Sequence, residues 1–279
     1  DGSHHDWFES RGPKCILMAF VDDATGEVYA RFYDYEGTLP AMDCFKGYIK
    51  QYGIPQSVYL DRHSTYKSTV HYQTIEDQLE DRHLMSQFER SLQELGVTVI
   101  HAYSPQAKGR VERLFGTFQD RVIKEMRLAG IKNKDEGNSF LDTYLPKYNR
   151  RFRVVPAEES DLHRPFKNRQ ELDRILSIRH ERALRNDFTI AHDKRLYQIK
   201  DNIRAKKVTV EKRTDGSMRV LHNGQRLKYQ EITVRPKKER KESPKLYKTW
   251  DRGKPARMHP WRAGFNPDRR QKTTMSTIP

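Results

Sequence analysis

The sequence predicts an α/β fold. Two β-rich runs joined by a turn lie near its start, apolar residues then recur at helical spacing, and short buried strands alternate with further helices. Such an alternation predicts a mixed sheet flanked by helices. Towards the C-terminus the pattern changes to short strands separated by turns, which predicts a second, all-β unit.

The first elements are a hairpin, a helix and a strand. The segment KCILMAFVDDATGEVYARFYDY is expected to be a hairpin with its turn at the letters DATG. A helix is expected next, with Thr38 as its cap and with Gly53 and Pro55 as its stop signals. The segment SVYLD is expected to be a short buried strand that ends at Asp61.

Two more helices and one more strand complete the predicted α/β part. The first of these helices has an apolar face and ends at Gly96; the face consists of Met85, Phe88, Leu92 and Leu95. The strand is VTVIHAY. The second helix follows the segment AYSPQAKGR, and its apolar face consists of Val111, Phe115, Phe118, Val122 and Met126.

The composition divides the chain into four parts. Residues 1–160 are expected to form the α/β domain, and residues 161–185 a linker that contains a short basic helix over 170–185. Residues 186–235 are expected to form a small barrel-like unit with turns at Asp215-Gly216 and Asn223-Gly224. Residues 236–279 contain few aliphatic residues and many Lys, Arg and Pro, which is typical of a disordered basic tail.

The charge of the chain indicates a polyanionic partner. Its 279 residues carry a formal net charge of +15, which favours nucleic acid, although a surplus that serves solubility would have the same sign. Cys15 and Cys44 are the two cysteines, so we expect no disulfide framework and a reducing cytoplasm. The sequence has no signal peptide and no apolar run long enough for a membrane span, so no membrane partner is expected.

Three carboxylates are candidates for catalysis because of the elements that carry them. Asp1 precedes the hairpin, Asp61 closes a strand, and Glu112 lies in the first turns of a helix. Ligands gather at strand ends and the neighbouring helix termini of an α/β sheet. Carboxylates placed there can hold two divalent ions for phosphodiester chemistry, and Mg²⁺ requires no cysteine or histidine.

Each candidate also has an ordinary explanation. Asp61 could simply end its strand, and Glu112, between Arg110 and Arg113, could be a solvated charge on a helix flank. Three other acids compete with Asp1: Asp6, Asp22 and Asp23. A zinc site is disfavoured, because no metal-ligand spacing is present among the histidines His4, His5, His63, His71, His83 and His101.

The segments DGSHH, YLDRHSTYKS and YSPQAKGRVERLFGTFQDRV together resemble the catalytic core of DDE transposases and retroviral integrases. The resemblance covers about residues 1–160, and its most specific part is the arrangement Tyr-x-Pro-Gln-x-x-Gly-x-x-Glu. It implies a ribonuclease-H-like core in which Asp1, Asp61 and Glu112 are the catalytic acids and hold two Mg²⁺ or Mn²⁺ ions. It also implies that the loop with the Pro-Gln and the Gly of this arrangement lies at the active site near the DNA.

Within that family the chain resembles a bacterial insertion-sequence transposase with an appended β-barrel. The resemblance implies metal-dependent DNA cleavage and strand transfer, a homo-oligomer on paired DNA ends, and a cytoplasmic location at the nucleoid. The barrel and the basic tail would hold DNA through phosphate contacts. Candidate DNA contacts in the core are Tyr103, Gln106, Lys108, Arg110 and Arg113.

The sequence departs from the family pattern in several places. The interval from Asp61 to Glu112 is longer than usual, Arg62-His63 follows the second acid, and Gly116 stands where many integrases carry a lysine. Because the sequence starts at Asp1, we expect that a strand and a helix-turn-helix domain lie upstream and that the backbone of Asp1 is poorly anchored. A nuclease of the same fold and a non-catalytic DNA-binding remnant are the alternative functions.

Overall fold

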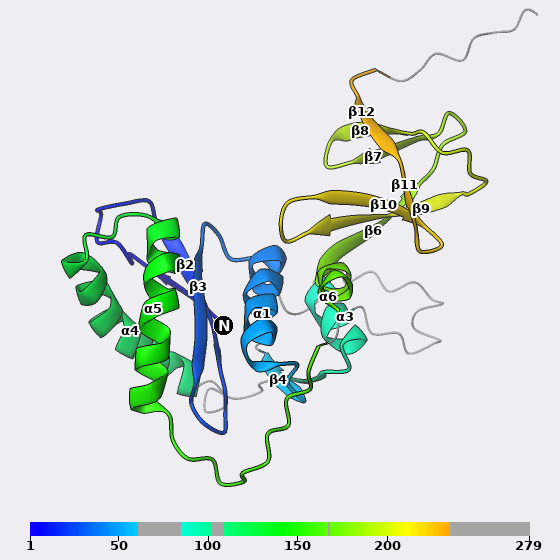
Figure 1. Cartoon of the computed structure of the whole chain (residues 1–279). Helices are drawn as coiled ribbons and strands as arrows, with labels where there is room; N and C mark the ends of the chain where they lie inside the picture. The colour runs from blue at the N-terminus through cyan, green and yellow to red at the C-terminus, as the bar shows by residue number, and fades with distance from the viewer. Residues whose placement is uncertain (61–84, 102–108, 167, 235–279) are drawn as a thin grey trace, which may run out of the picture. The chain divides into compact units, whose positions relative to one another are not determined.

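The N-terminal sheet is antiparallel and has the strand order β1-β2-β3 (Figure 1). The computed structural model of the protein describes residues 1–60, 85–101, 109–166 and 168–234. The sheet consists of β1 (Gly2–His5), β2 (Cys15–Val21) and β3 (Val28–Tyr33). The predicted hairpin is confirmed: Gly26 has a φ of 73° and donates its backbone N–H to Asp22 O at 2.8 Å.

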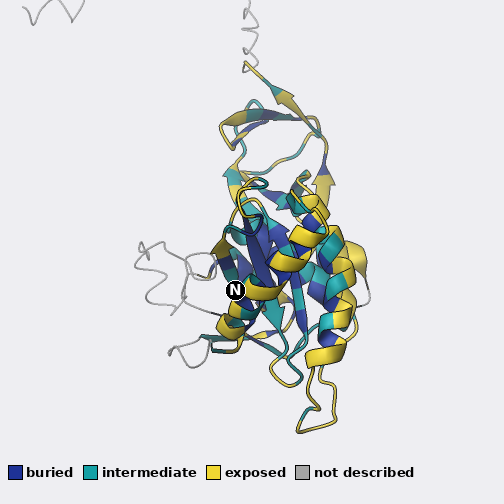
Figure 2. Ribbon diagram, turned by 90° about the vertical axis from the view of Figure 1, so that its left-hand side faces the viewer, coloured by how far each residue is buried: buried dark blue, intermediate teal, exposed yellow. Residues whose placement is uncertain are grey.

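Helices cover both faces of this sheet (Figure 1). Ile16 and Met18 of β2 pack in one cluster with α1 (Thr38–Tyr52), whereas Leu17 and Ala19 pack in another with α4 (Gly109–Leu128) and α5 (Lys134–Phe152). Successive side chains of a strand point to opposite faces, so a strand that is covered on both sides must be apolar at every position. This explains the continuous run CILMAFV. Figure 2 shows the buried strands beneath helices whose outer faces are exposed.

The start of α1 differs from the prediction. Thr38 is its first residue and not its cap, because Ala41 N–H donates to Gly37 O at 3.0 Å, which makes Gly37 the N-cap. Gly37 makes no side-chain capping bond. The predicted stop at Gly53 is confirmed, since this residue has a φ of 100° and its N–H donates to Ile49 O.

A second, parallel sheet contains β4 (Ser57–Leu60) and β5 (Thr98–His101). The helix α3 (Gln87–Glu94) precedes β5, begins with a capping box at Ser86, and is followed by Gly96 with a φ of 65°. The α/β class is therefore confirmed. Among the described residues, however, no backbone ladder joins β4 and β5 to the N-terminal sheet. The ribonuclease-H-like arrangement with one mixed sheet stays a prediction.

The helix α5 was not predicted from the sequence. It begins after Asn133, whose side chain accepts the Glu136 N–H at 2.9 Å. Gly137 and Pro146 inside the helix both lower its intrinsic helix propensity. Packing explains the glycine, because a Cβ at position 137 would lie 3.0 Å from the ring of Phe32.

Two asparagines of α5 bond to the backbone of β3. Asn149 accepts Val28 N–H at 3.0 Å and donates to Val28 O at 2.9 Å. Asn138 makes the same pair of bonds with Phe32, at 2.7 and 3.1 Å. The two side chains thus fix α5 alongside β3 through bonds to backbone groups that could otherwise pair with another strand.

The predicted basic helix over residues 170–185 is wrong beyond Ile175. The helix α6 (Arg169–Ile175) is followed by β6 (Ser177–Ala183), which pairs with β9 (Lys207–Arg213) along its whole length. The pairing of seven residues with a neighbouring strand outweighs the local helical pattern. Leu172 and Leu176 of this region belong to the same apolar cluster as α1 and α3.

The remaining strands form two sheets, with the orders β11-β10-β9-β6 and β12-β8-β7. These strands are β7 (Thr189–His192), β8 (Arg195–Ile199), β10 (Met218–His222), β11 (Gln225–Leu227) and β12 (Tyr229–Ile232). The predicted turns are confirmed by left-handed φ values at Gly216, Asn223 and Gly224. One apolar cluster includes side chains from both sheets, such as Tyr197 and Val210. A closed barrel stays a prediction, and the basic tail lies outside the described residues.

None of the described helices is both long enough and apolar enough to span a membrane.

Candidate catalytic cleft

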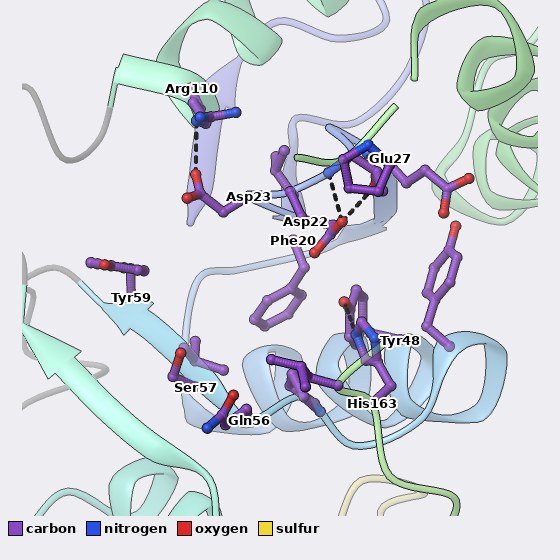
Figure 3. Close-up of a pocket in the computed structure, with 18 of the residues that line it drawn as sticks. Phe20, Asp22, Asp23, Glu27, Tyr48, Gln56, Ser57, Tyr59, Arg110 and His163 are labelled. Atoms are coloured by element: carbon purple, nitrogen blue, oxygen red, sulfur yellow. Dashed lines mark hydrogen bonds and ion pairs between the residues drawn. The ribbon is translucent and has the colours of Figure 1, made fainter. Parts of the chain in front are cut away.

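A cleft of about 850 Å³ lies beside the ends of several elements (Figure 3). Its walls come from β2 and the turn after it, α1, β4, the first turn of α4, and residues 156–163. Phe20 and Tyr48 give it an apolar wall, whereas carboxylates of the turn and of residues 158–161 give it a polar one. The volume is within the usual range for ligand sites in proteins.

Asp1 lines this cleft, and its backbone is anchored. Its N–H group donates to Ala19 O at 2.9 Å, and Ala19 N–H donates to Asp1 O at the same distance. The Asp1 carboxylate accepts Gly2 N–H at 3.0 Å. The expectation of a poorly anchored Asp1 is therefore wrong, because the strand that pairs with β2 follows this residue directly.

Contacts along α4 place Glu112 towards the start of β1. Gln119 donates to Ser3 Oγ at 3.3 Å, and Arg127, two turns further on, pairs with Glu9. The helix α4 therefore runs in the same direction as the N-terminal segment of the chain. The first turn of α4, which carries Glu112, lies at the end of the helix nearer the start of β1.

Glu112 is exposed, and the neighbouring Val111 lines the cleft. A carboxylate in the first turn of a helix interacts favourably with the free backbone N–H groups there. Asp61 lies outside the described residues, but Leu60, directly before it, is the last residue of β4 and also lines the cleft. Within the described ranges, no group of three or more His, Cys, Asp or Glu side chains forms a metal-binding cluster.

The two described candidates for DNA contact lie on the first turn of α4. Arg110 forms an ion pair with Asp23 at 2.7 Å (Figure 3). Arg113 is exposed and donates to Gly109 O within the helix. The other three candidates, Tyr103, Gln106 and Lys108, lie outside the described residues.

A linked set of polar side chains in the cleft was missed at the sequence level. Tyr48 Oη lies 2.8 Å from His163 Nε2 (Figure 3). On the other side of the ring, His163 Nδ1 lies 2.7 Å from Asp161 Oδ1. Bonds from the His163 backbone and ring lower the pKa of Asp161, and burial raises the pKa of Tyr48. These contacts tie residues 161–163 to α1. No local pattern in the segment ESDLHRP indicates a partner so far away in the sequence.

The polar wall of the cleft is mainly acidic. The carboxylates that line the cleft are Asp1, Asp22, Asp23, Glu27, Glu158, Glu159 and Asp161. Such a wall attracts divalent cations and repels phosphate groups.

Two curated bacterial proteins are similar to the chain in sequence. "Putative transposase y4bF" of Sinorhizobium fredii is 38% identical over 204 residues, which cover 72% of this chain and 43% of that protein. "Transposase for insertion sequence IS1202" of Streptococcus pneumoniae is 27% identical over 280 residues, which cover 94% of this chain and 57% of that protein. The chain spans about half the length of these relatives. No family model matches it.

Two solved structures also match. The catalytic core domain of BIV integrase has a TM-score of 0.35 and 21% identity, with 50% of this chain and 75% of that chain covered. A chain of the simian T-cell lymphotropic virus intasome, in complex with PP2A regulatory subunit B56 gamma, has a TM-score of 0.42 and 15% identity, with 79% and 73% covered.

The sequence relatives agree with the motif around Glu112 and support the superfamily of DDE transposases and retroviral integrases as the class of this chain. Within that superfamily, its curated relatives are transposases of bacteria.

Proposed function

We propose that the protein is a transposase that cleaves and joins DNA strands by a metal-dependent DDE mechanism. One observation carries the proposal: Asp1, Leu60 and Val111 line the same cleft. Leu60 directly precedes Asp61 and Val111 directly precedes Glu112. The residues that directly precede Asp61 and Glu112 in the sequence thus line the cleft that Asp1 also lines, which supports the proposal.

The donor set suits hard divalent ions. Asp1, Asp61 and Glu112 offer only carboxylate oxygens, which Mg²⁺ and Mn²⁺ both accept. Two such ions, when bound, would activate the attacking oxygen and stabilise the departing one. The acidic wall of the cleft supports the proposal, since it would add to the local attraction for cations.

The protein's own residues would position the DNA for two in-line displacements. In the first step a water oxygen bonds to phosphorus, the bond to the 3′ oxygen breaks, and that oxygen gains a proton as a hydroxyl. In the second step this 3′ hydroxyl attacks a phosphodiester of the target DNA and displaces its 3′ oxygen. Neither step needs a covalent bond to the enzyme. Arg110 and Arg113, with Tyr103, Gln106 and Lys108, would contact the DNA end.

The other proposed roles follow from the domain organisation. We propose residues 1–160 as a ribonuclease-H-like catalytic core and residues 186–235 with the basic tail as a DNA-holding part. Phosphate contacts of that part would make binding strongly salt-dependent. Copies of the protein would assemble on paired DNA ends in the bacterial cytoplasm.

The proposal is tested by a strand-transfer assay with Mg²⁺ on DNA that carries the element's own ends. The chain and a version extended upstream are compared with Asp61→Asn and Glu112→Gln. Both substitutions remove a metal-binding charge, so both should abolish transfer while DNA binding persists. Glu125→Gln, an exposed glutamate of the same helix, is the matched control and should remain active.

Each other outcome has a definite meaning. Transfer by either acid variant would refute the DDE assignment. Metal-dependent cleavage without joined products would indicate a nuclease of the same fold. DNA binding without any metal-dependent cleavage, by the chain and by its extended version, would indicate a non-catalytic remnant.

A further inference from the structure

His101 is the last residue of β5, and its ring faces the first turn of α3. The distance between His101 Nε2 and Glu89 Oε1 is 3.2 Å. The Glu89 side chain is 11% exposed and the His101 side chain 31% exposed, so water screens this pair less than a surface ion pair. The sequence offered His101 only as one of several scattered histidines, without a partner.

Glu89 is itself firmly held. Its backbone N–H donates to Ser86 Oγ at 3.1 Å, and its Oε2 accepts Ser86 N–H at 2.7 Å. This reciprocal pair is the capping box of α3. One oxygen of the Glu89 carboxylate therefore fixes the start of the helix, while the other lies 3.2 Å from Nε2 of the ring at the end of β5.

The two nitrogens of the His101 ring differ in their surroundings. Within the part of the chain that the structure describes, the Nδ1 atom is buried and has no hydrogen-bond partner. Nε2 is the ring nitrogen that faces the Glu89 carboxylate. A side chain that places a donor at the Nε2 position should preserve the link, whereas one that reaches only the Nδ1 position should not.

The pair lies at the end of the parallel sheet, from which the chain continues to the proposed catalytic acids Asp61 and Glu112. His101 is the register partner of Leu60 in the parallel pair of β4 and β5. Asp61 is the residue after Leu60, and the chain after His101 leads to α4, whose first turn carries Glu112. A shift of the end of β5 would therefore be transmitted to the backbone that leads to Asp61 and to Glu112, which are two of the three proposed catalytic acids.

We propose that His101 is a positioning residue of the transposase site, which acts through its ion pair with Glu89. The pair anchors the carboxyl end of β5 to the capped start of α3 and so keeps Asp61 and Glu112 in register for catalysis. This inference rests on the proposed function and adds to it a residue that need not touch the DNA or the metals. A displacement of reacting groups by a fraction of their spacing is enough to slow catalysis strongly.

Four variants of the chain test the inference: His101→Gln, His101→Asn, His101→Ala and the control Thr98→Ala. The glutamine amide nitrogen can occupy the Nε2 position, and the asparagine amide reaches only the Nδ1 position. Thr98 is an exposed residue of the same strand. Strand transfer is measured over a range of DNA concentrations, so that kcat and KM are obtained separately.

The expected result is a loss in kcat of about 10- to 100-fold for the alanine and asparagine variants, with KM nearly unchanged. The glutamine variant and Thr98→Ala should stay close to the wild-type rate. Equal rates for the glutamine and asparagine variants would overturn the inference, and so would a glutamine variant as slow as alanine.

Hydrogen exchange of the Thr98–His101 amides gives a second readout that does not need activity. Exchange should be faster in His101→Ala than in the wild type and should return to the wild-type rate in His101→Gln. Unchanged exchange in His101→Ala would overturn the anchoring. If neither the wild-type chain nor its version extended upstream transfers strands while the exchange pattern holds, the proposed function fails and the anchoring of β5 stands.

Discussion

Arg110 and Asp23 form a 2.7 Å ion pair between the first turn of α4 and the turn after β2 (Figure 3). Both side chains are more than half exposed, at 55% and 71%. Ion pairs as exposed as this one stabilise a protein by about 0–1 kcal/mol. A DNA phosphate can therefore replace Asp23 as the partner of Arg110 at little cost.

We predict that Asp23→Asn tightens DNA binding and that Arg110→Gln weakens it, because the first frees a cation and the second removes it. Both effects should shrink as salt is raised from about 50 to about 200 mM, since counterions compete with phosphate contacts. Fluorescence anisotropy with labelled DNA checks this. Asp142→Asn, which frees Arg31 from a 3.9 Å pair away from the cleft, is the control. Identical affinities for the two aspartate variants would contradict the prediction.

Gly116 lies one turn after Glu112 on the exposed side of α4, and a Cβ there would meet no atom within 4 Å. We predict that Gly116→Ala and Gly116→Lys both raise the free energy of unfolding by about 0.5–1 kcal/mol, because glycine is a poor helix former. Only the lysine variant should also bind DNA more tightly, through a new phosphate contact. Denaturant unfolding and anisotropy on both variants separate the two effects. Equal DNA affinity of the alanine and lysine variants would show that this turn does not face the DNA.

Asn149 is 6% exposed and makes two bonds to the backbone of Val28. Asn149→Ala leaves a buried N–H and a buried C=O without their partner, so we predict a loss of about 2–4 kcal/mol in the free energy of unfolding. Asn138→Ala should cost less, because its bonds to Phe32 are only partly buried. Urea denaturation of the two variants measures the difference. Equal losses of unfolding free energy in the two variants would mean that the burial of the bonds does not determine how much their removal destabilises the protein.

Burial raises the pKa of Cys15 and of Cys44 to about 12. An unfolded thiol ionises near pH 8.5, and the thiolate is the reactive form. We predict that iodoacetamide at about pH 8 labels neither cysteine in the folded protein and labels both after unfolding in urea. Mass spectrometry of the two cysteine peptides checks this. Because the pKa values are raised on folding, the thiols also favour the folded state below pH 8.5, and this contribution falls as the pH rises towards 12. Rapid labelling of Cys44 without denaturant would contradict its burial.

Much of the core fold could be predicted because local patterns carry it. The apolar run of β2, the turn ending at Gly26 and the apolar face of α4 each need only neighbouring residues to be recognised. The helix α5 could not be found in this way. Gly137 and Pro146 argue against a helix locally, and the contact that requires a glycine at position 137 involves Phe32, which is far away in the sequence.

The candidate site, too, could be predicted only where a local pattern indicates its residues. Glu112 was identified by a motif, whereas its position relative to the start of β1 depends on Gln119 bonding to Ser3, which no sequence spacing encodes. The Tyr48 to His163 link and the His101 to Glu89 pair are likewise long-range or depend on how a helix end meets a strand end. Sequence patterns indicate which side chains can do chemistry. Packing decides which of them meet.

The amides of Asn138 and Asn149 also close the outer edge of β3 to other strands. An exposed strand edge can recruit a strand of another molecule and so start uncontrolled aggregation. Here the outward backbone groups of Val28 and Phe32 already have partners. If copies of the protein assemble on DNA ends as proposed, contacts at this side of the sheet would then involve side-chain surfaces. Contacts between side chains can be weak enough to form only when DNA brings the copies together, whereas edge-to-edge pairing of strands would occur without DNA.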